Sequence, residues 1–200
     1  MKLFENPASG NCYKVRLLLH HLQLPFERVF VDVLPGTQRP PELLAHSTVG
    51  RVPLLELDDG TALGESNAIL HFLAAGTPYL PDDPLARSRV LAWMFFEQNL
   101  HEPNIATRRY WTSIAPDSAP RAAQLPFWLE SGERALRVME RELESSDFFG
   151  SPSYSIADIA LYGYTHVAPE GGFDLEPFPR LRAWLERVRE QPRHVPMSST

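Results

Sequence analysis

The turn at Ser9-Gly10-Asn11-Cys12 combines residue types that can activate a thiol. Turn-forming residues end an extended segment here and a helical pattern begins, so free amides and the helix dipole favour a thiolate over a thiol. The Ser9 hydroxyl can donate a hydrogen bond to such a thiolate. Taken alone, the turn is explained more simply by Ser9 or Asn11 capping the helix.

Cys12 is the single cysteine of the chain, which excludes an internal disulfide and a cysteine-rich metal site. It stands at the second position of a C-x-x-C pattern whose first position is Ser9, so a dithiol redox cycle is impossible. A cysteine at such a place is more often a small buried residue than a nucleophile, and we expect this of Cys12. An exposed thiol at the helix N-terminus would instead be reactive.

A second candidate segment is Arg51-Val52-Pro53, where proline opens a strand in the middle of a small sheet. Proline in that place normally costs a ladder hydrogen bond. A cis peptide bond before Pro53 would turn the amide and carbonyl of Val52 toward the backbone of a peptide ligand. A trans proline at an edge strand is the statistically commoner alternative.

A third candidate segment is Glu65-Ser66, at the exit of a hairpin into a helix. Ser66 and the first amides of that helix can bind a carboxylate, and Glu65 can pair with an ammonium group. The zwitterionic end of an amino acid is the natural ligand for this combination. Simple helix capping is again the alternative.

Other chemistries find little support in the sequence. His101-Glu102 begins like a zinc-protease motif, but Ile105 stands where the second histidine is required, so no metal site is predicted. The nucleophile elbow G-x-S-x-G is absent. A net charge of -6 argues against nucleic acid as a partner, and no stretch approaches the roughly 20 apolar residues of a membrane span. We therefore expect a soluble, cytoplasmic protein.

The hydrophobic periodicity predicts two domains. Over 1–76 it gives the order β-α-β-(α)-β-β-α, with strands at 2–5, 26–31, 52–57 and 61–63 and helices beginning at 11, 41 and 65. A proline-rich linker follows at 77–84. The rest, 85–200, shows helical patterns at 85–111, 122–143, 156–167 and 181–189. A short polar segment at 197–200 is expected to fray.

One helix of the second half carries a local folding signal. Ser155 and Asp158 have the spacing of a capping box, in which each side chain reaches the backbone amide of the other residue. This pair is assigned to helix capping rather than to catalysis.

The order of these motifs resembles the glutathione S-transferase family, particularly its bacterial members, over nearly the whole chain. The resemblance rests on Ser-x-Asn at the first turn, Arg-Val-Pro before the third strand, Glu-Ser at the next helix and Ser-Ile-Ala-Asp in the helical half. It implies a thioredoxin-like α/β N-terminal domain followed by an all-α C-terminal domain.

The resemblance also implies roles for individual residues. Ser9 would activate the glutathione thiol, Val52 would bind the cysteinyl backbone with Pro53 cis, and Glu65 and Ser66 would hold the γ-glutamyl end. Supporting contacts would come from Asn11, Gln38 and Arg51, and the electrophile pocket would be lined by Arg108, Tyr110 and Trp111. Family members often read Asn-Pro-x-Gly-Lys before Val-Pro; Ser47-Thr48-Val49-Gly50-Arg51 departs from this, which leaves the contact to the glycine end open.

The activity implied by the resemblance is conjugation of glutathione to a small electrophile, with a role in detoxification. Glutathione would be the co-substrate, no tightly bound cofactor would be needed, and the protein would form a homodimer. Two alternatives remain at this stage. The chain resembles family members that reduce disulfides with glutathione, and the fold also serves as a noncatalytic binding module.

Overall fold

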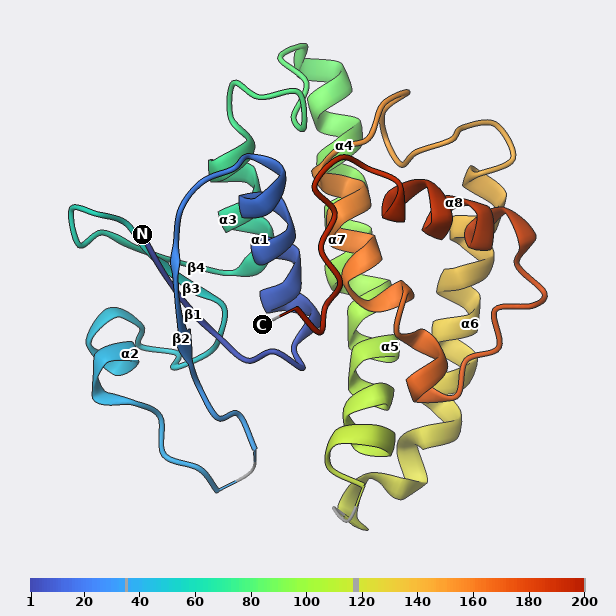
Figure 1. Cartoon of the computed structure of the whole chain (residues 1–200). Helices are drawn as coiled ribbons and strands as arrows, with labels where there is room; N and C mark the ends of the chain where they lie inside the picture. The colour runs from blue at the N-terminus through green and yellow to red at the C-terminus, as the bar shows by residue number, and fades with distance from the viewer. Residues whose placement is uncertain (35, 117–118, 200) are drawn as a thin grey trace. The chain divides into compact units, whose positions relative to one another are not determined.

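The computed structural model describes residues 1–34, 36–116 and 119–199, and its contacts divide the chain into two compact units. One comprises Met1–Ala75 together with Pro192–Thr200, and the other comprises Gly76–Gln191. The first is an α/β unit and the second is built from helices, which confirms the predicted fold class (Figure 1). The tail at 192–199 belongs to the α/β unit, although the sequence places it at the end of the helical domain.

The α/β unit contains one four-stranded mixed sheet. Its strands lie in the order β2-β1-β3-β4; β1 and β2 are parallel, and the other two pairings are antiparallel. The elements, in chain order, are β1 (Lys2–Glu5), α1 (Gly10–His21), β2 (Glu27–Phe30), α2 (Pro41–His46), β3 (Leu54–Glu56), β4 (Ala62–Gly64) and α3 (Ser66–Ala74).

Alternation of side chains along the strands gives the sheet an apolar layer on each face. Leu3 and Leu55 pack with residues of α1 and α3 in one buried cluster. Their neighbours Phe4 and Leu54 belong to another cluster, which includes Leu43 of α2. The sheet is therefore covered by α1 and α3 on one side and by α2 on the other (Figure 1).

The strand register brings four chain segments to one end of the sheet. Glu5 pairs with Phe30, Phe4 pairs with Leu54, and Leu54 pairs with Gly64. The last residues of β1, β2 and β4 therefore lie beside the first residue of β3. The loops after β1 and β2, the segment before β3 and the start of α3 all emerge there.

The stretch 85–111 is helical, as its pattern predicts, but it is not one uninterrupted α-helix. That stretch consists of α4 (Pro84–Phe96), the π-helical turn η1 (Glu97–His101), α5 (Glu102–Arg109) and the π-helical turn η2 (Tyr110–Ile114). Pro103 has no N–H to give to a carbonyl one turn earlier, and the widened turn η1 comes directly before it. The interruption of the helix before Pro103 thus takes the form of a π bulge.

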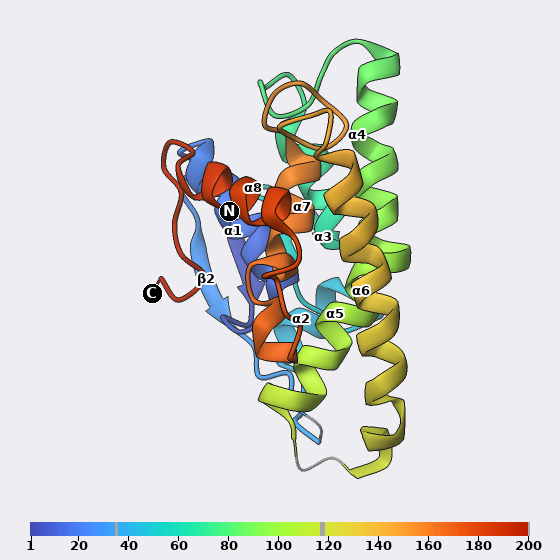
Figure 2. The ribbon, with the colours of Figure 1, turned by 90° about the vertical axis from the view of Figure 1, so that its right-hand side faces the viewer.

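The remaining elements of the helical unit pack around this interrupted helix. Figure 2 shows α6 running alongside α5, a pairing that the contacts confirm. Within the described ranges, no helix is long and apolar enough to cross a membrane. These elements are η3 (Ala119–Gln124), α6 (Leu125–Glu142), α7 (Ile156–Thr165), η4 (Ala168–Gly171) and α8 (Pro179–Arg189).

The predicted capping box is present at the start of α7. One carboxylate oxygen of Asp158 accepts from the Ser155 amide at 2.9 Å. The other oxygen accepts from the Phe149 amide at 3.0 Å and from the Trp184 indole at 2.9 Å. The box therefore holds a loop and α8 as well as its own helix.

Candidate functional site

Asn6 shapes the turn that carries Ser9. Its side-chain amide donates to the carbonyl of Val31, and its side-chain oxygen accepts from the amide of Ala8, both at 3.0 Å. Its own carbonyl accepts from the Ser9 amide at 3.0 Å. Sequence reasoning missed this residue; its signal is an asparagine at the start of a turn-forming cluster, where such side chains order the backbone.

Ser9 caps α1, as the simpler interpretation of the turn predicts. Its hydroxyl oxygen accepts a hydrogen bond from the Cys12 amide at 3.3 Å. An oxygen that accepts in this way still carries its own proton, which can be donated to an anion. Capping and thiolate activation by Ser9 are therefore compatible.

A hydrogen bond joins the first turns of α1 and α3. The Ser66 hydroxyl donates to the side-chain oxygen of Asn11 at 3.2 Å, and the ammonium group of Lys14 donates to the same oxygen at 2.8 Å. Ser66 and Lys14 are both buried. Two of the three candidate segments, more than fifty residues apart in the chain, are thus in direct contact.

Glu65 has an unusual backbone conformation just before α3. Its φ of 65° and ψ of 113° are rare for a residue with a side chain, and such conformations cost on the order of 1–3 kcal/mol. Its carboxylate is exposed and makes no capping hydrogen bond to α3. Capping therefore does not account for Glu65, and its carboxylate is available for a cationic group.

The peptide bond between Val52 and Pro53 is cis, the alternative that the resemblance implies, and not the commoner trans form. Pro53 is buried directly before β3, at the end of the sheet where Glu65 follows β4. Arg51 and Gln38 are exposed, on the segment before β3 and the loop after β2. The described residues give neither of these two side chains a hydrogen bond or an ion pair, so the structure does not tie them to Ser9 or Ser66.

Cys12 is the small buried residue that the sequence predicts. It is fully inaccessible, and its sulfur accepts from the Asn6 amide at 3.4 Å. Burial raises the pKa of the thiol to about 12, because a thiolate there would be stripped of water. The Cys12 thiol therefore stays protonated near neutral pH and is a poor nucleophile.

The three residues predicted for the electrophile pocket lie at the junction of α5 and η2, in the helical unit. Arg108 donates to the carbonyls of Gly171 at 2.6 Å and Leu125 at 2.5 Å, and partial burial lowers the pKa of its guanidinium. Arg108 therefore braces the helical unit. Tyr110 and Trp111 are in edge-to-face contact, with ring centres 4.8 Å apart.

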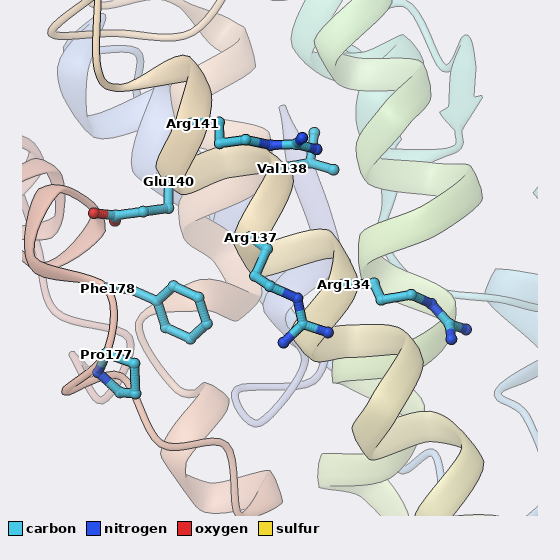
Figure 3. Close-up of a pocket in the computed structure, with 7 residues that line it drawn as sticks. All are labelled: Arg134, Arg137, Val138, Glu140, Arg141, Pro177 and Phe178. Carbon is cyan, nitrogen blue, oxygen red and sulfur yellow. The ribbon is translucent and has the colours of Figure 1, made fainter.

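A groove of about 640 Å³ lies on the helical unit, and its lining includes none of the candidate residues (Figure 3). Two of its three arginines form ion pairs within α6, Arg134 with Glu130 at 2.7 Å and Arg137 with Glu133 at 3.4 Å. Its acidic residue, Glu140, accepts from the first amides of α8. Arg134 and Arg137 are therefore paired within α6, and Glu140 joins α6 to the start of α8. The lining residues are Arg134, Arg137, Val138, Glu140, Arg141, Pro177 and Phe178.

Comparisons with known proteins agree with this architecture. The chain matches the family model "Glutathione S-transferase, N-terminal domain" over 8–75 and "Glutathione S-transferase, C-terminal domain" over 117–187. It is 30% identical to the Disulfide-bond oxidoreductase YfcG of Escherichia coli (strain K12), over 92% of this chain and 88% of that protein.

Two solved structures extend the comparison. A glutathione S-transferase from Pseudomonas fluorescens Pf-5 is 47% identical, with a TM-score of 0.94 over 99% of this chain and 98% of the other. A sphingomonad glutathione S-transferase complexed with glutathione is 27% identical, with a TM-score of 0.79 over 96% of this chain and 94% of the other.

Proposed function

Because the chain belongs to the glutathione S-transferase family, we propose that it binds reduced glutathione at the Ser9 end of the sheet and transfers its thiolate to a small electrophile. The observation that carries the proposal is the hydrogen bond between Ser66 and Asn11, because it places the starts of α1 and α3 together. The cis Val52–Pro53 segment and Glu65 emerge at the same end of the sheet.

The three parts of the tripeptide have chemically matched partners in this arrangement. The γ-glutamyl carboxylate suits the first amides of α3 and the Ser66 hydroxyl, whose single proton would turn from Asn11 to the ligand while Lys14 still donates to Asn11. The ammonium group of the ligand suits the exposed carboxylate of Glu65. The cysteinyl backbone suits the free amide and carbonyl of Val52. Gln38 and Arg51 are proposed to reach the glycine end from the neighbouring loops.

The proposed reaction is a nucleophilic substitution or addition. The Ser9 hydroxyl and the N-terminus of α1 stabilise the glutathione thiolate, whose sulfur forms a bond to an electrophilic carbon. In a substitution, the leaving group departs with the electron pair of the broken bond. The electrophile is proposed to sit against Tyr110 and Trp111, and the reaction uses no tightly bound cofactor.

Replacement of Ser66 with alanine is expected to weaken glutathione binding about 10- to 100-fold, the loss of one hydrogen bond to a charged group. Isothermal titration with reduced glutathione measures this. Ser88→Ala is the matched control, because the Ser88 hydroxyl donates only locally to the carbonyl of Pro84 in the helical unit. Equal affinity of the Ser66 variant and the parent would remove Ser66 from the site.

Replacement of Ser9 with alanine is expected to raise the thiol pKa of bound glutathione and to slow conjugation about 10- to 100-fold. Binding of glutathione should change less than turnover, since the hydroxyl is proposed to act on the sulfur alone. Ultraviolet titration of the bound thiolate, run beside a conjugation assay with an aromatic halide, measures both effects. An unchanged thiolate titration would exclude this role of Ser9.

A second candidate function is glutathione-dependent reduction of a disulfide substrate. It is favoured by the similarity to the Escherichia coli protein named as a disulfide-bond oxidoreductase. Because Cys12 is buried and protonated, the exchanging thiols would have to come from glutathione. Comparing turnover of hydroxyethyl disulfide with that of an aromatic halide separates the two reactions; glutathione binding without either turnover would point to a noncatalytic module.

We also propose that the protein acts in the cytoplasm as a homodimer. Leu100 and Phe127 of the helical unit are each more than half exposed and line the same groove. Exposed apolar side chains that lie together are typical of surfaces that associate. Light scattering during gel filtration measures the oligomeric state, and a monomer at micromolar concentration would contradict the proposal.

A further inference from the structure

The tail at 192–199 is held on the α/β unit by its own backbone carbonyls. Four carbonyls of the tail accept from side chains of α1 and β2, and these contacts do not depend on the identity of the tail side chains. The contacts are Tyr13 Oη to Val195 at 2.7 Å, Arg16 Nη2 to Met197 at 2.6 Å, Arg28 Nη1 to Ser199 at 2.9 Å and His21 Nδ1 with Pro192 at 2.8 Å.

These contacts bracket the turn that carries Ser9. On the far side of the turn, Tyr13 donates its amide to the Ser9 carbonyl at 3.0 Å. On the near side, Arg16 and Arg28 each bind one carboxylate oxygen of Glu5, the last residue of β1. The tail therefore fixes residues on both sides of the Ser9 turn.

The donors that the tail satisfies are largely out of reach of water. Tyr13 and Arg16 are fully buried. A buried guanidinium or hydroxyl that loses its hydrogen-bond acceptor destabilises the folded state. Release of the tail would therefore leave these donors unpaired at a cost in free energy. The hydroxyl of Tyr13 also makes a 3.2 Å contact with the His194 ring.

We infer that the tail at 192–199 is a positioning segment that holds the Ser9–Tyr13 turn closed. It does so through Tyr13 and Arg16. The predicted effect of the tail on glutathione binding rests on the proposed function. The predicted effect of the tail on the Ser9–Tyr13 turn is independent of that function.

Cys12 gives a direct measure of the turn, because its buried sulfur lies in the first turn of α1. The rate at which 5,5′-dithiobis(2-nitrobenzoate) labels Cys12 in the native chain reports how often the turn opens. Tyr13→Phe removes the hydroxyl and keeps the ring, so it is expected to raise the labelling rate about tenfold. Deletion of 192–200 should raise the rate further, and Tyr13→Phe should have no added effect in the deleted chain.

Two controls separate local positioning from general stability. Tyr79→Phe makes the same change in the helical unit and should leave the labelling rate unchanged. Labelling at several low urea concentrations distinguishes the two mechanisms, because local opening is insensitive to denaturant whereas global unfolding is not. If the deleted chain does not fold, the labelling rates of the parent and of Tyr13→Phe in the full chain still test whether the tail positions the turn.

The glutathione arm uses the same variants. We expect the dissociation constant of glutathione to rise several-fold in Tyr13→Phe, and addition of a synthetic peptide with the sequence of 192–199 to slow Cys12 labelling in the deleted chain. An unchanged labelling rate in both tail variants would overturn the inference. If the parent binds no glutathione, the proposed function fails while the labelling comparison still decides the role of the tail.

Discussion

Replacing Glu5 with glutamine is expected to lower the free energy of unfolding of the α/β unit by about 3–5 kcal/mol, the usual cost of removing one partner from a buried ion pair. Glu5 and Arg16 are both buried, and Arg28 binds the second carboxylate oxygen. Glutamine keeps the shape of the side chain but leaves two guanidinium groups without their counter-charge. Its amide group would also face one of them.

The measurement needs a signal from the α/β unit alone. All four tryptophans lie in the helical unit, at 93, 111, 128 and 184, whereas Cys12 lies in the α/β unit. Pulsed labelling of Cys12 across a urea series therefore reports the unfolding of the α/β unit.

Glu56→Gln is the matched control on the same sheet. Its side chain is paired with Lys2 at 3.6 Å and with His46 at 3.4 Å, and it is partly exposed. Such pairs contribute about 0–1 kcal/mol, so the urea midpoint should move little. Equal shifts of the urea midpoint in the Glu5 and Glu56 variants would show that burial of the ion pairs of Glu5 does not account for the loss of stability.

Asp158→Asn is expected to destabilise the helical unit by about 3 kcal/mol at pH 8. One oxygen of this carboxylate accepts from Phe149 and Trp184, and the other accepts from Ser155. Whichever way the asparagine amide is turned, its NH₂ group faces N–H donors. Tryptophan fluorescence across a urea series measures the loss, since Trp184 is one of the donors.

Asp83→Asn is the control for this change. Asp83 caps α4 by accepting from the Ala86 amide at 2.8 Å in an exposed position, and asparagine caps equally well. Its effect should lie within about 0.5 kcal/mol. A loss as large as that of the Asp158 variant would contradict the explanation based on buried donors.

The Asp158 carboxyl also has a predictable pH dependence. Burial raises its pKa to about 7 from 3.8, although four hydrogen bonds oppose the shift. Between about pH 4 and pH 7 the native state holds a proton that the unfolded chain has released, so this group makes the parent less stable as the pH rises. The Asp158→Asn variant cannot titrate and should lack that contribution, so the stability difference should be larger at pH 5 than at pH 8.

The features that were predicted correctly are those that depend directly on residue type and on spacing along the chain. The strand and helix order follows from apolar spacing, and the capping box at Ser155 and Asp158 follows from side-chain chemistry. A proline in an improbable place left a cis and a trans bond open at Pro53, and the family resemblance implied the cis form that is present. Each of these depends on residues close together in the chain, where spacing fixes geometry.

The features that were missed depend on the backbone or on distant partners. The sequence predicts fraying at 197–200, where most side chains are small and polar, yet the carbonyls of Met197 and Ser199 accept from Arg16 of α1 and Arg28 of β2. Glu5 looked like an ordinary strand residue, because its partners at Arg16 and Arg28 are set by tertiary structure. The resemblance placed Arg108 in a ligand pocket. Its contacts with Gly171 and Leu125 were not predicted, because the sequence does not fix how the helix is rotated.

The hairpin between β3 and β4 has a practical consequence for handling this protein. Because the site segments emerge where β3 begins and β4 ends, the turn at Asp58-Asp59-Gly60 lies at the opposite end of both strands. It is exposed, but Gly60 itself has a φ of 83°, which residues with a side chain rarely adopt, so Gly60 should be kept. An affinity tag or fluorophore introduced beside Gly60 in this hairpin would therefore leave clear the end of the sheet that is proposed to bind glutathione.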